Sequence, residues 1–172
     1  MKESFNFLLK VESNTYLEHY GIDFEDFEIG QVFEHRPGRT FTEADCLQHG
    51  IRSLDLTPAT VDRHYAQAVY GERSFVMESY ALSAMASTTK TFGKVVANLS
   101  MTDFEIEPIA IGDTLYFESK ILEKRESRSR PDQGLLQIET RAHNQHRQWV
   151  LSFQRKLLIY RKGLGPYNAA GY

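Results

Sequence analysis

Two acidic side chains stand where the local sequence suggests chemistry. Asp55 precedes the pair Thr57-Pro58, which is typical of a helix start. Glu78 opens the most apolar stretch of the chain, where a carboxylate is either solvated in a first helical turn or part of a site. Asp55 is either a general base or a loop carboxylate ahead of the Thr57 cap. If the two carboxylates converge, they can form a coupled acid–base pair.

The histidines and the single cysteine are weaker candidates. His49 lies on an expected helix, seven residues after Thr42, and faces either a cleft or solvent. We interpret His64 as a structural or surface histidine, and Cys46 as buried filler because nothing nearby marks an activated thiol. The six histidines show no metal-ligand spacing, so we predict no metal site.

A basic run occurs late in the chain. Its members, with two glutamates between them, are Lys124, Arg125, Arg128 and Arg130. One interpretation is a solvated hairpin tip. The other is a contact for the phosphate groups of a ligand.

Composition excludes several classes of protein. The 172 residues predict one domain over residues 1–172, with an N-terminal wrapping segment over about 1–30 and a C-terminal tail over about 162–172. The expected anchors of the wrapping segment are aromatic: Tyr16, Tyr20, Phe24 and Phe27. A net charge of −3 argues against nucleic-acid binding. Neither a membrane span nor a signal peptide is recognisable, so we expect a cytoplasmic protein that does not bind membranes.

Three helices are expected. The first begins at Thr42, which a carboxylate at Asp45 completes as a variant capping box. The second begins at Thr57-Pro58 and runs to about Val69, where Gly71 ends it. The third covers residues 76–89 and is apolar or small all round, which indicates a buried helix.

The remaining pattern has a period of two and predicts strands. A short strand at residues 31–35 meets a break at Pro37-Gly38, and a bulge near Thr102-Asp103 interrupts the strand that starts at Val95. Three further strands follow, so we expect a four-stranded antiparallel meander with one more strand before it. A long sheet wrapped around one buried helix describes an α+β hotdog fold, whose domains generally dimerise, so we expect a homodimer.

Several stretches resemble the MaoC-like (R)-specific enoyl-CoA hydratase/dehydratase family, and most closely its mesaconyl-CoA hydratase-like branch. They spread over about residues 16–161 and comprise the runs 24–30, 40–45, 108–115, 122–127 and 150–155. The family's hydratase motif reads G-D-x-N-P-x-H-x-D-x-x-Y-A and aligns with residues 54–66. Five positions match it, namely Asp55, Pro58, Asp62, Tyr65 and Ala66.

The motif is also broken in three places. Leu54 replaces the glycine, Thr57 replaces the asparagine, and Thr60 replaces the catalytic histidine. In the family, an Asp/His pair holds the water and moves the protons during hydration of an enoyl thioester. A threonine hydroxyl can position water but is no base near pH 7. In relatives, the N–H of a glycine near the start of the helix expected over residues 76–89 helps to polarise the thioester carbonyl. Glu78 lies at or next to the position of that glycine.

The resemblance implies a substrate and a set of site residues. We expect an acyl thioester of coenzyme A or of a carrier protein, with no separate cofactor. The phosphates that the basic run would contact are then those of coenzyme A or of a phosphopantetheine arm. Catalysis would involve Asp55, Thr60 and Glu78. Substrate contacts would come from Pro58, Met77, Ser79 and Arg125.

Two alternatives stay open at this point. One is an acyl thioesterase that uses Glu78 and Asp55, because hotdog thioesterases place a carboxylate near this helix. The other is a catalytically degenerate subunit that binds an acyl thioester in a hetero-oligomer with an intact hydratase subunit. The loss of the histidine at position 60 motivates the second alternative.

Overall fold

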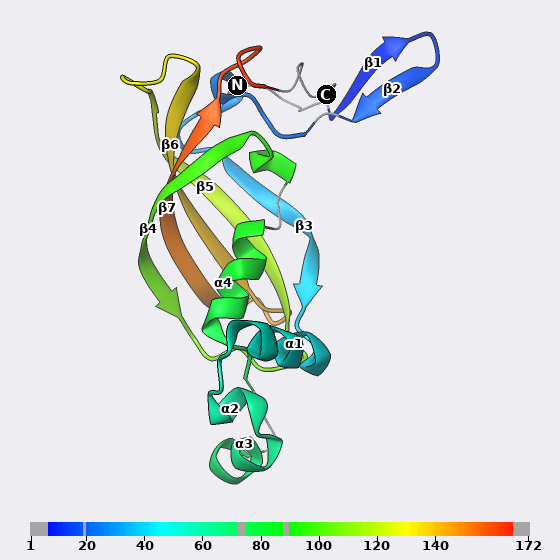
Figure 1. Ribbon diagram of the computed structural model, residues 1–172, viewed down its shortest axis with the longest axis vertical. Coiled ribbons are helices and arrows are strands. Elements are labelled where there is room, and N and C mark those ends of the chain that lie inside the picture. The colour runs from blue at the N-terminus through cyan, green and yellow to red at the C-terminus, as the bar shows by residue number, and fades with distance from the viewer. Residues whose placement is uncertain (1–6, 19, 72–74, 88–89, 167–172) are drawn as a thin grey trace.

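The structure is a computed structural model that describes residues 7–18, 20–71, 75–87 and 90–166. One long antiparallel sheet curves around a single central helix, with three short helices at one end and the first and last described residues at the other (Figure 1). The strands are β1 (Leu8–Glu12), β2 (Thr15–Glu18), β3 (Val32–Thr40), β4 (Val95–Ile106), β5 (Thr114–Glu126), β6 (Gln133–His143) and β7 (Trp149–Tyr160). The helices are α1 (Glu43–Ser53), α2 (Pro58–Val61), α3 (Arg63–Tyr70) and α4 (Glu78–Ser87), with 3-10 turns η1 (Phe24–Asp26) and η2 (Lys90–Phe92). This is the predicted α+β hotdog arrangement.

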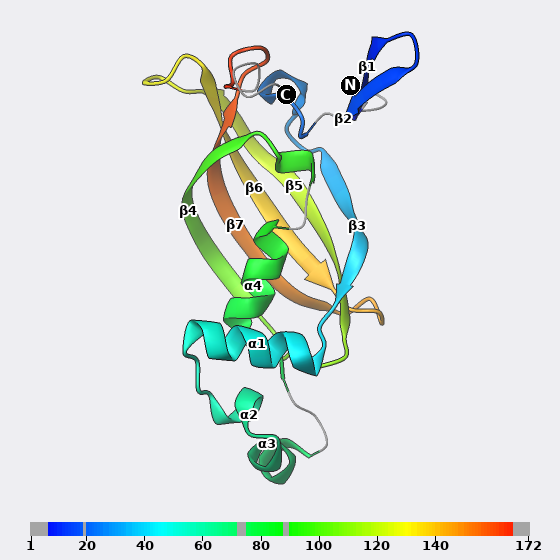
Figure 2. The same ribbon diagram turned by 45° about the vertical axis from the view of Figure 1, so that its right-hand side comes forward.

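The strand order is β3-β5-β6-β7-β4, so only β5, β6 and β7 form a meander. The expected four-stranded meander was wrong, because β4 pairs with β7 rather than with β5. After α4 the chain returns along the far edge of the sheet and then crosses below the helix through residues 107–113. The connections before and after β4 thus pass the two opposite ends of α4, which lies between them on one face of the sheet (Figure 2).

The predicted bulge in β4 is confirmed. The pairing register with β7 shifts between Thr102 and Glu105, and Asp103 adopts a φ of 56°. β3 differs from the expectation because Pro37 and Gly38 do not end it. The strand continues to Thr40, and only its register with β5 shifts, between His35 and Arg39. An edge strand tolerates a proline because its outward N–H is not needed for pairing.

The helices follow the sequence signals in part. Thr42 begins α1 with the predicted capping box, since its hydroxyl accepts from Asp45 N–H and the Asp45 carboxylate accepts from Thr42 N–H. The expected helix from Thr57 to Val69 is instead two helices, divided at Asp62. The Asp62 side chain accepts from Tyr65 N–H and so begins α3 anew.

Helix α4 is buried on one side only. Ala81, Ala84 and Met85 face the sheet and are 0–5% exposed, whereas Ser79 and Ser83 are exposed. The expectation of burial all round was therefore wrong for a single chain, and the last predicted residues of the helix, 88–89, lie outside the described part. The serines leave one polar face of α4 open beside α1.

The core consists of two apolar clusters along the inner face of the sheet. One surrounds α4, and the other lies under the N-terminal segment, where Phe24 and Phe27 are buried. Phe27 stacks on Phe92 with 5.7 Å between ring centroids. Tyr16 and Tyr20 are more than half exposed, so of the four predicted aromatic anchors only the two phenylalanines are buried. Within the described residues, no helix is long and apolar enough to span a membrane.

Candidate active site around α1, α2 and the start of α4

The loop that carries Asp55 begins at a left-handed residue. Leu54 ends α1 with φ 56° and ψ 27°, and its N–H donates to Gly50 O. Asp55 N–H then donates to the same carbonyl at 3.2 Å. Leu54 occupies the position of the motif glycine, and the left-handed conformation is the one that favours glycine. Leu54 therefore adopts a conformation that glycine would adopt without strain.

The Asp55 carboxylate is held by Thr57. Its Oδ1 accepts from Thr57 N–H at 3.0 Å and from the Thr57 hydroxyl at 2.6 Å. These two hydrogen bonds, the hydroxyl first, lower the pKa of Asp55 below its usual value, and the nearby charge of His49 lowers it further. Thr57 is the N-cap residue of α2 and Pro58 follows it, as predicted, but the Thr57 hydroxyl donates to Asp55 and makes no cap bond. Asp55 is accordingly a charged, oriented hydrogen-bond acceptor at neutral pH.

Thr60 lies in the first turn of α2 and is half-buried. Its hydroxyl donates to Thr57 O at 2.9 Å, a hydrogen bond within the same turn. Pro58 is the first residue of this helix and is exposed. Since a hydroxyl is no proton acceptor near pH 7, position 60 supplies no base.

Helix α4 begins directly after Met77, because the N–H groups of Tyr80 and Ala81 both donate to Met77 O, at 3.0 and 3.1 Å. Glu78 and Ser79 are thus its first residues, and first-turn N–H groups have no acceptor within their helix. Such a helix start favours negative charge and can stabilise an oxyanion. The Glu78 side chain is exposed at this position.

Gly50 is the point where the Asp55 loop reaches the start of α4. A Cβ atom on Gly50 would lie 2.9 Å from Met77 Cε and 3.4 Å from Asp55 O. Met77 is 2% exposed and fills the space beside this glycine. The sequence separates the two segments by more than twenty residues, but the fold brings them into one cluster.

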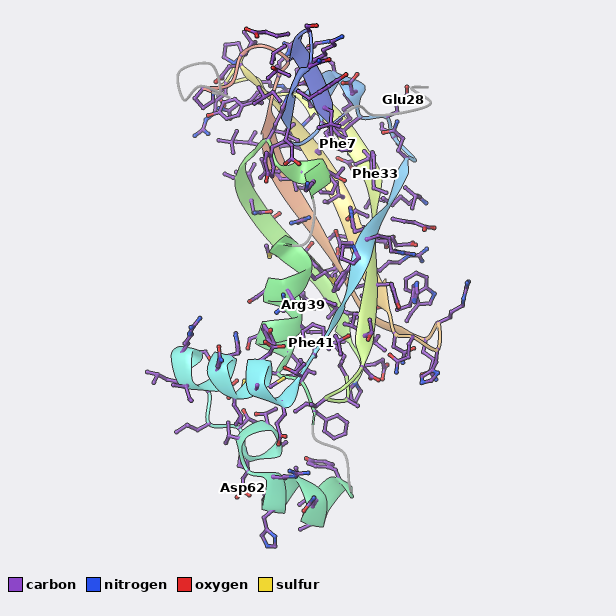
Figure 3. All side chains as sticks on the ribbon, turned by 90° about the vertical axis from the view of Figure 1, so that its right-hand side faces the viewer. Phe7, Glu28, Phe33, Arg39, Phe41 and Asp62 are labelled. Carbon is purple, nitrogen blue, oxygen red and sulfur yellow. The ribbon has the colours of Figure 1, made fainter. Side chains whose placement is uncertain are left out.

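His49 is part of the same cluster, and we gave it little weight from the sequence. Its Nε2 lies 3.0 Å from Ser79 Oγ, and its ring stacks on Tyr80 with 4.8 Å between centroids. Arg39 donates to the Tyr80 hydroxyl at 2.8 Å. Figure 3 places Arg39 at the lower end of β3, beside α4. The only sequence signal was that His49 follows Thr42 by seven residues, about two helical turns.

The predicted site residues therefore separate into two groups. Asp55, Pro58 and Thr60 lie at the α1–α3 end of the molecule, as do the residues that begin α4. Arg125 lies on β5 near its turn into β6, at the opposite end of the sheet (Figure 1). Within one chain the structure does not bring Arg125 to Asp55.

Arg125 instead borders a hollow of about 590 Å³. The lining combines three arginines, two serines and three leucines: Arg125, Arg128, Arg130, Ser127, Ser129, Leu99, Leu135 and Leu158. Among the described residues, no group of three histidine, cysteine or acidic side chains is arranged to hold a metal ion.

The described geometry can be compared with known proteins. A family model described as mesaconyl-CoA hydratase matches residues 2–170. No curated protein matches. Among solved structures, the chain is similar to a MaoC-like dehydratase from Rhodospirillum rubrum (19% identity, 83% of this chain and 99% of that chain, TM-score 0.71). It is also similar to the R-hydratase PhaJ1 from Pseudomonas aeruginosa (21% identity, 83% and 88%, TM-score 0.66).

A third similar structure is a Mycobacterium tuberculosis protein with a double hotdog fold (23% identity, TM-score 0.73). The match covers 83% of this chain and 45% of that one, so the chain spans less than half its length. At these identities the solved structures establish the shared fold, and the family match covers almost the whole chain.

Proposed function

The chain belongs to the mesaconyl-CoA hydratase family of MaoC-like proteins, and on that premise we propose that it hydrates an enoyl thioester or dehydrates a 3-hydroxyacyl thioester. The observation that carries this proposal is the meeting of the Asp55 loop and the start of α4 at Gly50. There the backbone of the Asp55 loop approaches the side chain of Met77, the residue before α4. This supports a site in which a charged hydrogen-bond acceptor for water works with a helix start that can polarise a thioester carbonyl.

In this reaction the Asp55 carboxylate and the start of α4 would act on different atoms of the thioester. Asp55 would hold the attacking water at the β-carbon, since its pKa is low enough to keep it a carboxylate. The first N–H groups of α4 would stabilise the negative charge that develops on the thioester oxygen. We assign to Thr60 and Glu78 the positioning of water and the shaping of the acyl pocket.

The hollow around Arg125 supports a phosphate-bearing carrier for the acyl group. Strand alternation sends the neighbouring charges to the other side of the sheet, where they are used in structural contacts. Lys124 Nζ donates to the carbonyls of Glu25 and Phe27 at 2.9 and 2.6 Å, and Glu126 pairs with Arg161 at 3.3 Å.

Two of the three arginines of the hollow donate hydrogen bonds to residues near them in the sequence, Arg125 to Glu126 O at 3.4 Å and Arg130 to Gln133 Oε1 at 3.5 Å. In the part of the chain that the structure describes, none of Arg125, Arg128 and Arg130 forms an ion pair with a carboxylate. Guanidinium groups over an apolar floor suit the nucleotide phosphates of coenzyme A. We therefore favour coenzyme A over a carrier protein.

A homodimer would bring this hollow towards the catalytic cluster. β4 is an edge strand whose side chains Leu99, Met101 and Phe104 are 41–52% exposed, and an open apolar edge of this length is a template for pairing. Two-fold antiparallel pairing of β4 with its copy places the Val95 end of one chain beside the Ile106 end of the other. The arginine hollow of one subunit then lies at the same end of the joined sheet as the Asp55 loop of its partner.

A direct assay tests the proposed function. Purified protein is mixed with crotonyl-, mesaconyl- and itaconyl-CoA, and the loss of the enoyl-thioester absorbance is followed together with the release of free thiol. We expect hydration without thiol release, and Asp55→Ala should abolish it. Thiol release that Glu78→Gln abolishes would instead establish the thioesterase.

The oligomeric state tests the alternative that the chain is a catalytically degenerate subunit of a hetero-oligomer. Light scattering after gel filtration should give twice the mass of the chain. An inactive protein that co-purifies from its native source with an intact hydratase subunit would establish the degenerate subunit and overturn the proposed function.

A further inference from the structure

The cluster in which the Asp55 loop meets the start of α4 contains an imidazole, His49, that lies outside the family motif. Position 60 carries threonine, whereas His49 on α1 reaches the first turn of α4 and lies 3.0 Å from Ser79 Oγ. Its side chain is half-exposed, so a small molecule at the start of α4 can reach it. Imidazole is the side chain whose ordinary pKa suits proton transfer near neutral pH.

The ring of His49 is held in one orientation. It stacks on Tyr80 at an interplanar angle of 22°, and Tyr80 is itself fixed on two sides. Arg39 donates to its hydroxyl, and Phe41 meets its ring edge-on with 5.2 Å between centroids. An acid–base group held by such a shell needs little rearrangement during the reaction.

His49 is also coupled to Asp55. Gly50 follows His49 directly, and its carbonyl accepts the N–H of Asp55. A positive charge on His49 is the smallest of the causes that lower the pKa of Asp55, so the imidazole lies within electrostatic range of the carboxylate. The cluster thus holds a carboxylate and an imidazole, the two group types of the family's acid–base pair.

The other described histidines lie elsewhere. His35 is buried against Ser119, and His143 stacks on Tyr116. His64 is exposed on α3, and His146 lies in the turn between β6 and β7. Among the histidines in the described ranges, His49 alone forms a hydrogen bond or a ring contact with α4.

We propose that His49 is the acid–base residue of this site and takes the role that position 60 has in the family motif. The inference rests on the proposed hydratase function. Neutral His49 removes a proton from the water that Asp55 holds, while the water oxygen bonds to the β-carbon. The π electron pair moves to the α-carbon, with its charge shared by the thioester oxygen at the start of α4. The imidazolium then returns a proton to the α-carbon, so the net change is addition of one water.

The test compares two histidine variants on the same thioester. His49→Gln keeps a side chain that can bond Ser79 but removes the titrating group, and His64→Gln is the matched control on an exposed helix. We expect His49→Gln to lower kcat by about 10²–10⁴-fold with a small change in KM. It should also remove the near-neutral limb of the pH–rate profile, whereas His64→Gln should match the unsubstituted protein.

A rescue variant separates catalysis from structure. Thr60→His combined with His49→Gln places an imidazole at the motif position. If this double variant regains turnover and a near-neutral limb of the pH–rate profile, the defect of His49→Gln is the loss of an acid–base group. Full turnover and an unchanged pH profile in His49→Gln would overturn the role of His49 while leaving the hydratase function intact. No turnover by the unsubstituted protein on any enoyl thioester would overturn both. Circular dichroism melting checks that each variant is folded.

Discussion

Thr57 donates two hydrogen bonds to one oxygen of Asp55, from its amide at 3.0 Å and from its hydroxyl at 2.6 Å. The pair converts a loop carboxylate into an oriented group whose pKa lies below the ordinary value. Because Asp55 is stabilised in its charged form, its contribution to folding is present above the ordinary pKa. That contribution is lost as the pH falls through the lowered value.

Thr57→Val should raise the pKa of Asp55, because it removes the hydroxyl donor and retains the amide. Carboxyl-carbon NMR titration of the two proteins measures the change. The acid limb of the hydration rate should move to higher pH in the same variant. An Asp55 titration identical to that of the unsubstituted protein would show that the hydroxyl bond does not form in solution.

Leu54→Gly should stabilise the protein. Leu54 has a φ of 56° and is 84% exposed, so glycine relieves the strain and loses no packing. We expect a gain of about 0.5–1 kcal/mol in the free energy of unfolding after allowance for the greater freedom of glycine in the unfolded chain. Urea unfolding measures it. Leu56→Gly is the control, since Leu56 is 77% exposed without a positive φ, and it should bring no gain.

The stability of the fold should depend on pH through His35. This side chain is 5% exposed and its Nε2 lies 2.9 Å from Ser119 Oγ. Burial first, and then the charges of Arg155 and Arg36, lower its pKa to about 4. The unfolded chain binds the proton at higher pH than the folded one, so stability falls as the pH drops from about 6.5 to about 4.

The expected loss is up to about 3 kcal/mol over that range. Urea unfolding at pH 7, 6, 5 and 4 measures it, and His35→Gln should flatten this part of the profile. Equal pH dependence in both proteins would mean that other groups cause it.

Gly134 is required by Phe24. A Cβ atom at Gly134 would lie 2.2 Å from two atoms of the Phe24 ring, which is closer than any real contact. Gly134→Ala should therefore displace the ring and cost about 1–3 kcal/mol of stability. In the double variant with Phe24→Ala the alanine should add almost nothing, and a thermodynamic cycle from urea unfolding tests this coupling. Additive losses would contradict the contact.

Much of the secondary structure could be predicted because its signals are local. The capping box at Thr42 and the bulge near Asp103 depend on hydrogen bonds and steric limits within a few residues. Local signals also misled where two of them compete. Asp62 can cap a helix as well as lie within one, and the structure uses it as a cap, which divides the expected helix in two.

Only the part of the site that lies within the family motif could be predicted from the sequence. The motif located Asp55 and the loss of histidine at position 60, but it gave no information on His49. The hydrogen bond between His49 and Ser79 forms because α1 packs across the start of α4, and these two residues are thirty positions apart in the sequence.

By itself, the sequence of this protein determined the types and approximate limits of most elements, the hotdog class and the family. The tertiary structure decided that β4 pairs with β7, that Arg125 lies at the opposite end of the sheet from Asp55, and that His49 meets Ser79. The physical reason is the range of the forces. Backbone preferences and caps act over a few residues, whereas burial of α4 by the whole sheet fixes which distant side chains become neighbours.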